Sequence, residues 1–269
     1  MKLAKPISNL HTHTTFSDGS GSVEENIAAA LEAGFVSLGI SDHTYIESEG
    51  FGVKVGSERE YAAAVRRIKE EYKEKITLFC GLELDAGLVC NRSLYDYIIA
   101  SVHFINVNGK TYPIDYSKEM QKKTVEEAFG GQEHLYAKAY FDTLADHVIA
   151  SKPDIVGHFD LITKYDSIDE NDTRYRKAAL DALHAIFKTC RRFEVNTGAM
   201  ARGCKKGSYP ADFILEEIRR LGGSVTVSSD SHTPQNIDFA FEETVERLKS
   251  LGFGSIDRLT ENGFVSDEI

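Results

Sequence analysis

The sequence predicts an α/β protein, and the simplest arrangement is a closed barrel of parallel strands with helices around it. Three observations point to this class: β-rich runs alternate with helical patterns, seven such runs occur, and histidines and acids gather where the runs end. Alternation of this kind favours parallel strands joined by crossover helices. Seven strands suggest a TIM-like (β/α)7 barrel, and an open doubly wound sheet is the alternative.

The expected strands are short runs rich in apolar and β-branched residues, bounded by turn residues. In chain order they are residues 7–13, 36–43, 76–84, 97–103, 155–160, 193–198 and 224–229.

The expected helices carry recognisable start and stop signals. The helix at 23–33 follows Ser22, with Glu25 three residues later as in a capping box, and ends at Gly34. Further helices are expected at 58–72, 212–221 and 238–251. The stretch 106–151 resembles an insertion, with a loop at 106–117 and one or two helices. In a barrel such an insertion would lie near the active-site face.

Length and composition bound the class of protein. The chain has 269 residues, 42% hydrophobic and 27% charged, which is typical of a globular protein. Length alone leaves one or two domains open, whereas a barrel predicts a single domain over 1–269. The chain has no run of about 18 apolar residues and no leader-like start, so a cytoplasmic location is expected. The four cysteines form no C-x-x-C pair, which argues against a cysteine zinc site.

The charge balance bears on partners. With 31 Lys and Arg against 42 Asp and Glu, the net charge is −11. Nucleic-acid binders usually present a basic surface, so neither a nucleic acid nor a membrane is expected as a partner. A small anionic substrate remains compatible, since bound metals can reverse the local field.

The positions of the histidines carry the strongest functional signal. Residues i and i+2 of a strand point the same way, so His11 with His13, and Asp230 with His232, can each reach one metal. Imidazole and carboxylate are ligands for Zn, Mn or Fe. The carboxyl ends of parallel strands form the active-site face of a barrel. The candidate ligands at strand ends are His11, His13, His43, Glu83, His103, His158, Asp230 and His232.

Six motifs resemble, in order, those of the PHP (polymerase and histidinol phosphatase) family. They are HTHTTFSDGS (11–20), SDH (41–43), GLE (81–83), SVH (101–103), GHFD (157–160) and SDSH (229–232). Within the family, GHFDLITKY (157–165) and EVNTGAMARG (194–203) are similar to the histidinol-phosphatase branch. The resemblance covers nearly the whole chain.

The resemblance implies a distorted (β/α)7 barrel with three divalent metal ions, Zn, Mn or Fe. Asp18 stands where some relatives have a histidine, and Asp18-Gly19 is also a turn signal, so a turn residue is the alternative. The implied sets are His11, His13, Glu83 and Asp230 for one metal; Glu83, His103 and His158 for a second; and Asp18, His43 and His232 for a third.

The implied activity is that of a phosphomonoesterase of histidine biosynthesis. It would hydrolyse L-histidinol phosphate to L-histidinol and phosphate, with a hydroxide between metals as the nucleophile. The alternative is a PHP phosphoesterase acting on nucleotides or other small phosphate esters. A domain that has lost catalysis, or an amidohydrolase barrel, fits the ligand set and the motif spacing less well.

The remaining candidates concern the substrate. We expect Arg202 and Lys164, together with Asp18, to act in catalysis, because cationic groups stabilise phosphoryl charge. The resemblance implies an arginine at or beside position 164, and the lysine found there cannot form the same bidentate contact. We expect Arg202, Lys164 and Asp115 to bind the substrate, with Tyr140 and Asp160 assisting. Asp42 is expected to orient His43. The oligomeric state stays open.

Overall fold

A seven-stranded parallel sheet forms the centre of the molecule, in the order β1-β2-β3-β4-β7-β8-β9. The computed structural model describes residues 3–45, 50, 52–53 and 57–269. Each expected run overlaps one strand; β3 ends one residue later and β8 begins one residue earlier than expected, and several strands are shorter than the run. They are β1 (Ser8–Asn9), β2 (Ser37–Ile40), β3 (Thr77–Asp85), β4 (Tyr97–Ser101), β7 (Ile155–Val156), β8 (Arg192–Asn196) and β9 (Ser224–Ser228).

The two outer strands, β1 and β9, meet through the segments that follow them. Thr12 forms a parallel bridge with Ser231, and the His13 backbone N–H donates to the Ser231 carbonyl at 2.9 Å. Below this bridge the Asn9 amide donates to Ser229 Oγ at 2.6 Å. The sheet therefore nearly closes on itself, which confirms the TIM-like barrel and excludes the open doubly wound sheet.

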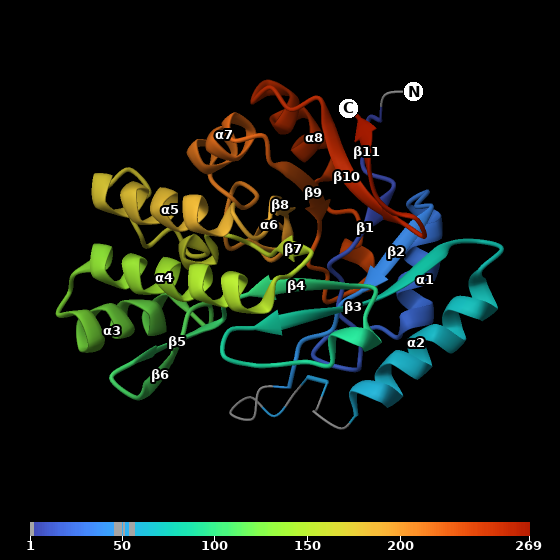
Figure 1. Cartoon of the computed structure of the whole chain (residues 1–269), viewed down its shortest axis with the longest axis horizontal. Helices are drawn as coiled ribbons and strands as arrows, with labels where there is room; N and C mark the ends of the chain where they lie inside the picture. The colour runs from blue at the N-terminus through green and yellow to red at the C-terminus, as the bar shows by residue number, and fades with distance from the viewer. Residues whose placement is uncertain (1–2, 46–49, 51, 54–56) are drawn as a thin grey trace.

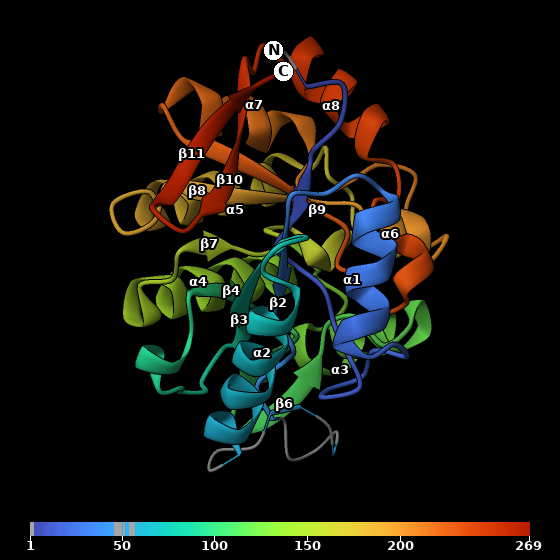
Figure 2. The same ribbon diagram turned by 90° about the vertical axis from the view of Figure 1, so that its right-hand side faces the viewer.

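The helices surround the barrel (Figures 1 and 2). The expected capping box of α1 is confirmed, because Ser22 Oγ accepts from the Glu25 N–H at 3.2 Å and Glu25 Oε2 accepts from the Ser22 N–H at 2.7 Å. The last helix begins later than expected because Ala240 adopts a left-handed conformation at its start. The helices are α1 (Val23–Glu32), α2 (Glu58–Tyr72), α3 (Lys118–Phe129), α4 (Glu133–Ser151), α5 (Thr173–Ile186), α6 (Gly198–Ala201), α7 (Asp212–Arg220) and α8 (Phe241–Ser250).

The insertion between β4 and β7 is partly different from expectation. Instead of a loop at 106–117, the chain forms an antiparallel hairpin, β5 (Phe104–Val107) with β6 (Lys110–Pro113). Asn108 and Gly109 both have positive φ, at 53° and 81°, as a tight Asn-Gly hairpin turn requires. Two helices, α3 and α4, follow, and α4 lies between α3 and α5 (Figure 1).

A second hairpin, which the sequence reading did not anticipate, ends the chain. Strands β10 (Ser255–Thr260) and β11 (Gly263–Glu268) pair antiparallel, and β10 packs beside β9. The Leu3 N–H donates to the Glu268 carbonyl at 2.8 Å, so the first described residues and the C-terminus lie side by side (Figures 1 and 2). Leu259 packs in one cluster with residues of the barrel interior and so helps to close the amino ends of the strands.

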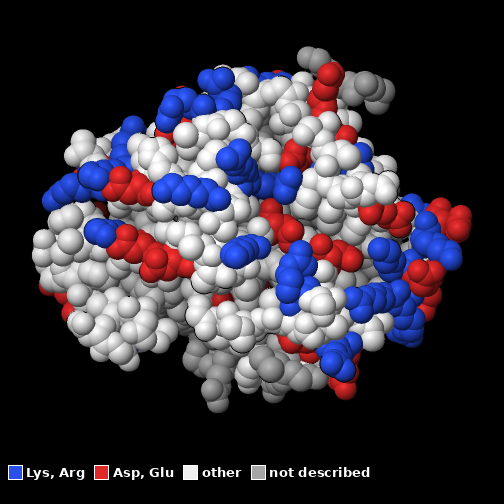
Figure 3. Space-filling model, in the orientation of Figure 1, with Lys and Arg blue, Asp and Glu red and all other residues white. Residues whose placement is uncertain are grey.

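Charged side chains of both signs are interleaved over the face seen in Figure 3. Several form ion pairs one helical turn apart, such as Lys177 with Asp181 at 2.6 Å. Within the described residues, none of the helices is both long and apolar enough to cross a membrane.

The barrel interior is filled around one aromatic side chain, Tyr97. Its ring is 0% exposed, and its hydroxyl donates to the Leu10 carbonyl. A Cβ added at Gly39 would lie 2.1 Å from the Tyr97 hydroxyl, and one added at Gly81 would lie 2.2 Å from Tyr97 Cζ. The two glycines, on β2 and β3, therefore leave the space that the tyrosine fills.

We expect Gly81→Ala to lower the free energy of unfolding by about 1–3 kcal/mol, since Tyr97 is enclosed and overpacking forces neighbours out of place. Denaturant unfolding measures the change. The control is Gly254→Ala, where an added Cβ meets no described heavy atom within 4 Å. Equal unfolding free energies for the two variants would contradict this account of the interior.

Candidate metal centre

The predicted ligands converge at the carboxyl end of the barrel. His11 and His13 follow β1, His43 follows β2, and Glu83 lies within β3. The ends of β4, β7 and β9 supply His103, His158, Asp230 and His232, and the loop after His13 brings Asp18. Most of these side chains are buried, so the strands that carry them fix their positions.

The carboxylate of Glu83 lies at the centre of this cluster. Five imidazole nitrogens lie within 4 Å of it. Oε2 is 2.8 Å from His43 Nδ1, 3.2 Å from His11 Nε2 and 3.5 Å from His13 Nε2; Oε1 is 2.9 Å from His158 Nε2 and 3.7 Å from His103 Nε2. The two oxygens thus face two different sets of histidines, which is the arrangement that a bridging ligand needs.

Two further carboxylates complete the cluster. Asp230 Oδ1 lies 3.2 Å from His13 Nε2 and 3.7 Å from His11 Nε2. Asp18 Oδ2 lies 3.1 Å from His232 Nε2, and Oδ1 lies 3.7 Å from His43 Nε2. The structure therefore brings Asp18 to the imidazoles, even though it stands in a turn.

Three overlapping groups have donor atoms within 4.8 Å of one another and could hold a metal ion. They differ in detail from the predicted sets, because His13 joins the group of Asp18, and His43 stands with Glu83 and His103 where His158 was expected. The groups are His13, Asp18, His43 and His232; His11, His13 and Glu83; and His43, Glu83 and His103.

The chemistry of these donors fits divalent metals. Among the described residues, His13 Nδ1 and His158 Nδ1 are buried without a hydrogen-bond partner. Leaving such atoms unsatisfied is unfavourable. Burial and the nearby His232 and His43 lower the pKa of His13 to about 3, which keeps its ring neutral at neutral pH. Glu83 and Asp85, acting against burial, raise the pKa of His103 to about 10, so a metal ion would displace a proton from that ring on binding. Nitrogen and oxygen donors without sulfur suit Zn, Mn or Fe.

Glu194 and Asp85, which the sequence reading missed as site residues, orient two of the imidazoles. Glu194 is 0% exposed and accepts from His11 Nδ1 at 2.6 Å and from the His158 backbone N–H at 2.7 Å. Asp85 lies 3.2 Å from His103 Nδ1. With Nδ1 protonated, each ring turns the lone pair of Nε2 toward Glu83. Asp85 could have been found from its i+2 spacing from Glu83. Glu194 could have been found from its place in a predicted strand.

A pocket of about 510 Å³ opens above the cluster. Eight of its eleven lining residues were predicted as site residues, whereas the apolar wall of Phe104, Tyr116 and Leu161 was not predicted. Phe104 and Tyr116 come from the insertion. The lining consists of Asp18, His43, His103, Phe104, Asp115, Tyr116, Leu161, Lys164, Arg202, Asp230 and His232.

Both predicted cations of the pocket have partners there. Lys164 Nζ lies 2.7 Å from Asp115 Oδ2, and although burial acts in the opposite sense, this ammonium keeps the pKa of Asp115 below its ordinary value. Arg202 Nη2 lies 3.0 Å from Asp230 Oδ2, and Nη1 lies 3.2 Å from His232 Nδ1. These contacts hold both cations beside the cluster.

Three expectations need correction. Tyr140 and Asp160 are both 0% exposed and lie outside the pocket, because Tyr140 belongs to the hydrophobic core and Asp160 accepts from the Ala211 N–H at 3.0 Å. Neither is placed to touch a molecule in the pocket. Asp42 accepts from the N–H and the hydroxyl of Thr14, each at 2.8 Å, and from Ser17. It therefore holds the loop between His13 and Asp18 and does not orient His43.

Comparison with known proteins relates this chain to the PHP domain and to proteins named histidinol-phosphatase. The model of the PHP domain matches residues 9–198. The chain is 26% identical over 263 residues to a probable histidinol-phosphatase of Schizosaccharomyces pombe, covering 88% of this chain and 83% of the relative. It is 24% identical over 263 residues to the histidinol-phosphatase of Bacillus subtilis, covering 88% and 97%.

The fold is also similar to a solved structure. Histidinol phosphate phosphatase from Lactococcus lactis, in complex with zinc, L-histidinol and phosphate, aligns with a TM-score of 0.74 at 20% identity, over 98% of this chain and 100% of that one. At this identity the likeness supports the fold.

We expect Glu194→Gln to weaken metal binding about 10- to 100-fold, since a carboxylate that holds a ligating histidine tunes its orientation and basicity. Metal content after dialysis against graded free zinc measures the effect. The control is Glu217→Gln, which alters a carboxylate that lies 2.5 Å from His184 far from the cluster. Unchanged zinc affinity in Glu194→Gln would show that His11 keeps its position without this partner.

Proposed function

The chain belongs to the PHP domain family, and on that premise we propose that it is a metal-dependent phosphomonoesterase that hydrolyses L-histidinol phosphate to L-histidinol and phosphate. One observation carries the proposal: a pocket whose floor is a cluster of histidines and carboxylates also holds two cations, Arg202 and Lys164. The curated relatives named histidinol-phosphatase support the choice of substrate. Such a step in histidine biosynthesis would take place in the cytoplasm.

The residues of the cluster suffice for three metal ions. Bound divalent ions would supply a hydroxide nucleophile at neutral pH and neutralise phosphoryl oxygens during in-line displacement. The first ion would be held by His11, His13, Glu83 and Asp230, the second by Glu83, His103 and His158, and the third by Asp18, His43 and His232.

Arg202 is the residue best placed to bind the phosphate group. Its guanidinium faces the pocket, and its contacts with Asp230 and His232 fix the planar group in place. Two parallel N–H groups match two phosphoryl oxygens, which a single ammonium cannot do. Lys164 lies across the pocket, and its pairing with Asp115 holds the ammonium as a point charge facing the same space.

The other end of the substrate would meet the insertion. Asp115 offers a carboxylate to the substrate ammonium, while Phe104 and Tyr116, with ring centroids 6.1 Å apart, give an aromatic wall for the imidazole. Aromatic rings favour edge-to-face and offset contacts with other rings. The insertion thus supplies the parts of the pocket that could recognise histidinol rather than phosphate.

We expect the zinc- or manganese-loaded protein to release phosphate from L-histidinol phosphate with a kcat/KM at least about 100-fold above that for p-nitrophenyl phosphate or a mononucleotide, a difference of roughly 2.7 kcal/mol. A chelator should abolish the activity, and added metal should restore it. Comparable or higher rates on the mononucleotide would discard the named substrate and favour a nucleotide or general phosphoesterase.

We expect Arg202→Ala to lower kcat/KM about 100-fold, as loss of a single charge-stabilising donor commonly does. Because Arg202 contacts Asp230, metal content must be measured beside the rate. Arg220→Ala, at an exposed arginine paired with Glu217, is the control. If Arg202→Ala binds its full complement of metal and keeps an unchanged kcat/KM, Arg202 does not bind the phosphate group.

A further inference from the structure

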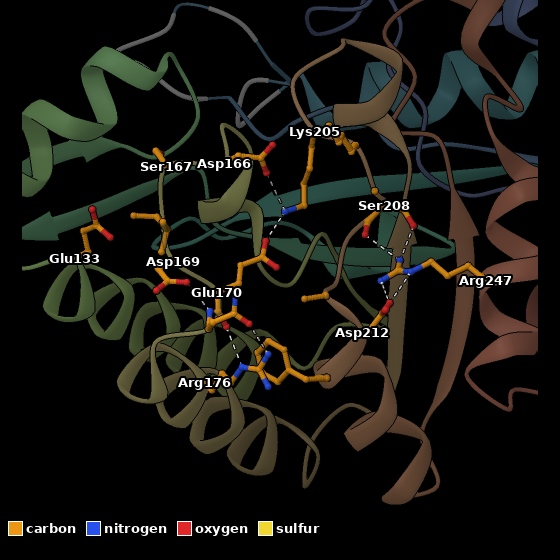
Figure 4. A pocket seen from close by; sticks show the side chains of 16 residues that line it. Glu133, Asp166, Ser167, Asp169, Glu170, Arg176, Lys205, Ser208, Asp212 and Arg247 are labelled. Carbon is orange, nitrogen blue, oxygen red and sulfur yellow. Dashed lines mark hydrogen bonds and ion pairs between the residues drawn. The ribbon is translucent and has the colours of Figure 1, made fainter.

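A hollow of about 870 Å³ has lining residues from two loops, 166–171 and 205–211, and from the start of α7. Figure 4 shows Lys205 reaching from one loop toward Asp166 and Glu170 of the other. Lys164 and Arg202, which line the pocket, lie just before these two loops in the sequence, so the same two stretches of chain border both spaces.

The ammonium of Lys205 joins the two walls. Its Nζ forms an ion pair with Glu170, donates to Thr163 Oγ1 at 2.9 Å and lies 3.8 Å from Asp166 Oδ1. The side chain is only 9% exposed. A charge at such a depth is costly unless it keeps its partners, so this geometry is strongly preferred.

These contacts reach the backbone that carries both cations of the pocket. Thr163 immediately precedes Lys164, and Arg202 stands three residues before Lys205. The turn from Arg202 to Lys205 is compact, because the Cys204 and Lys205 N–H groups both donate to the Ala199 carbonyl, at 2.9 and 3.3 Å. A displacement of Lys205 would therefore be transmitted to Arg202, and a displacement of Thr163 to Lys164.

We propose that Lys205 is a positioning residue that sets the spacing of Lys164 and Arg202 across the pocket by linking their two loops through Thr163 and Glu170. The inference rests on the proposed function, since the two cations are taken to bind a phosphate ester. Lys205 itself lies outside the pocket and acts only through them.

The expected signature is a loss of substrate binding with little loss of turnover. The metal-site residues are held by the strands, whereas Lys164 and Arg202 depend on loops. If the loops are no longer linked, substrate binding must also order them, which makes the free energy of binding less favourable. Interactions made equally in the ground state and the transition state appear in KM rather than in kcat. We expect Lys205→Met to raise KM about tenfold, which equals about 1.4 kcal/mol, and to change kcat by less than about twofold.

Lys206→Met is the matched control, because Lys206 is the next residue, is exposed and lines the same hollow. KM and kcat are measured for both variants with L-histidinol phosphate and with p-nitrophenyl phosphate, beside metal content and melting temperature. A lower kcat at unchanged KM would show a purely structural role for Lys205 and overturn the proposal. An equal rise of KM in Lys206→Met would do the same.

A second variant tests the route of the effect. Glu170→Gln removes the charge that Lys205 contacts. If Lys205 acts through Glu170, the KM values of the single variants and of the double variant should be similar, because the effects of coupled residues do not add. If instead the double variant raises KM by the product of the two single effects, the link between Lys205 and Glu170 is contradicted. Glu170 is partly exposed, so this variant remains informative if Lys205→Met folds poorly.

Hydrogen–deuterium exchange of the metal-free protein separates this inference from the proposed function. In Lys205→Met, peptides covering 161–165 and 198–204 should exchange at least about threefold faster than in wild type or Lys206→Met, as locally loosened segments do. Unchanged exchange would overturn the inference even if L-histidinol phosphate is the substrate. Faster exchange, with weaker binding of inorganic phosphate to the zinc-loaded variant, would support it even if another ester is the substrate.

Discussion

Five imidazoles surround the buried carboxylate of Glu83, and the carboxyl end of the barrel is arranged around this one group. An ionised carboxylate at the centre of a barrel is unfavourable unless charges and donors face it. The histidines that meet this need follow strands β1, β2, β4 and β7. Strands that are far apart in the sequence therefore end at the same cluster.

A layer of buried carboxylates stands behind the imidazoles. Glu194 ties His11 to the backbone of His158, Asp85 holds His103, and Asp42 holds the loop between His13 and Asp18. The bonds to His11 and His103 each occupy one ring nitrogen and leave the other nitrogen for the cluster. The rigidity of the centre thus comes from hydrogen bonds of the barrel as well as from the strands themselves.

The pocket above the centre is built differently. Its cations and aromatic side chains come from loops and from the β5–β6 hairpin, not from the strands of the barrel. Such segments tolerate change more readily than the strands do, while they carry the contacts that discriminate substrates. Cross-links between loops, such as the one that Lys205 makes with Thr163 and Glu170, would then set how precisely the pocket is formed.

The sequence by itself determined the seven strands, the capping box of α1 and the residues that gather at the strand ends. Periodicity, capping and i, i+2 spacing are local, so they can be read without knowing the neighbours. Only the tertiary structure decided which carboxylate holds which histidine, since His11 and Glu194 are 183 positions apart. It also buried Tyr140 and Asp160 away from the pocket and formed the C-terminal hairpin. Such contacts follow from packing, which no local pattern records.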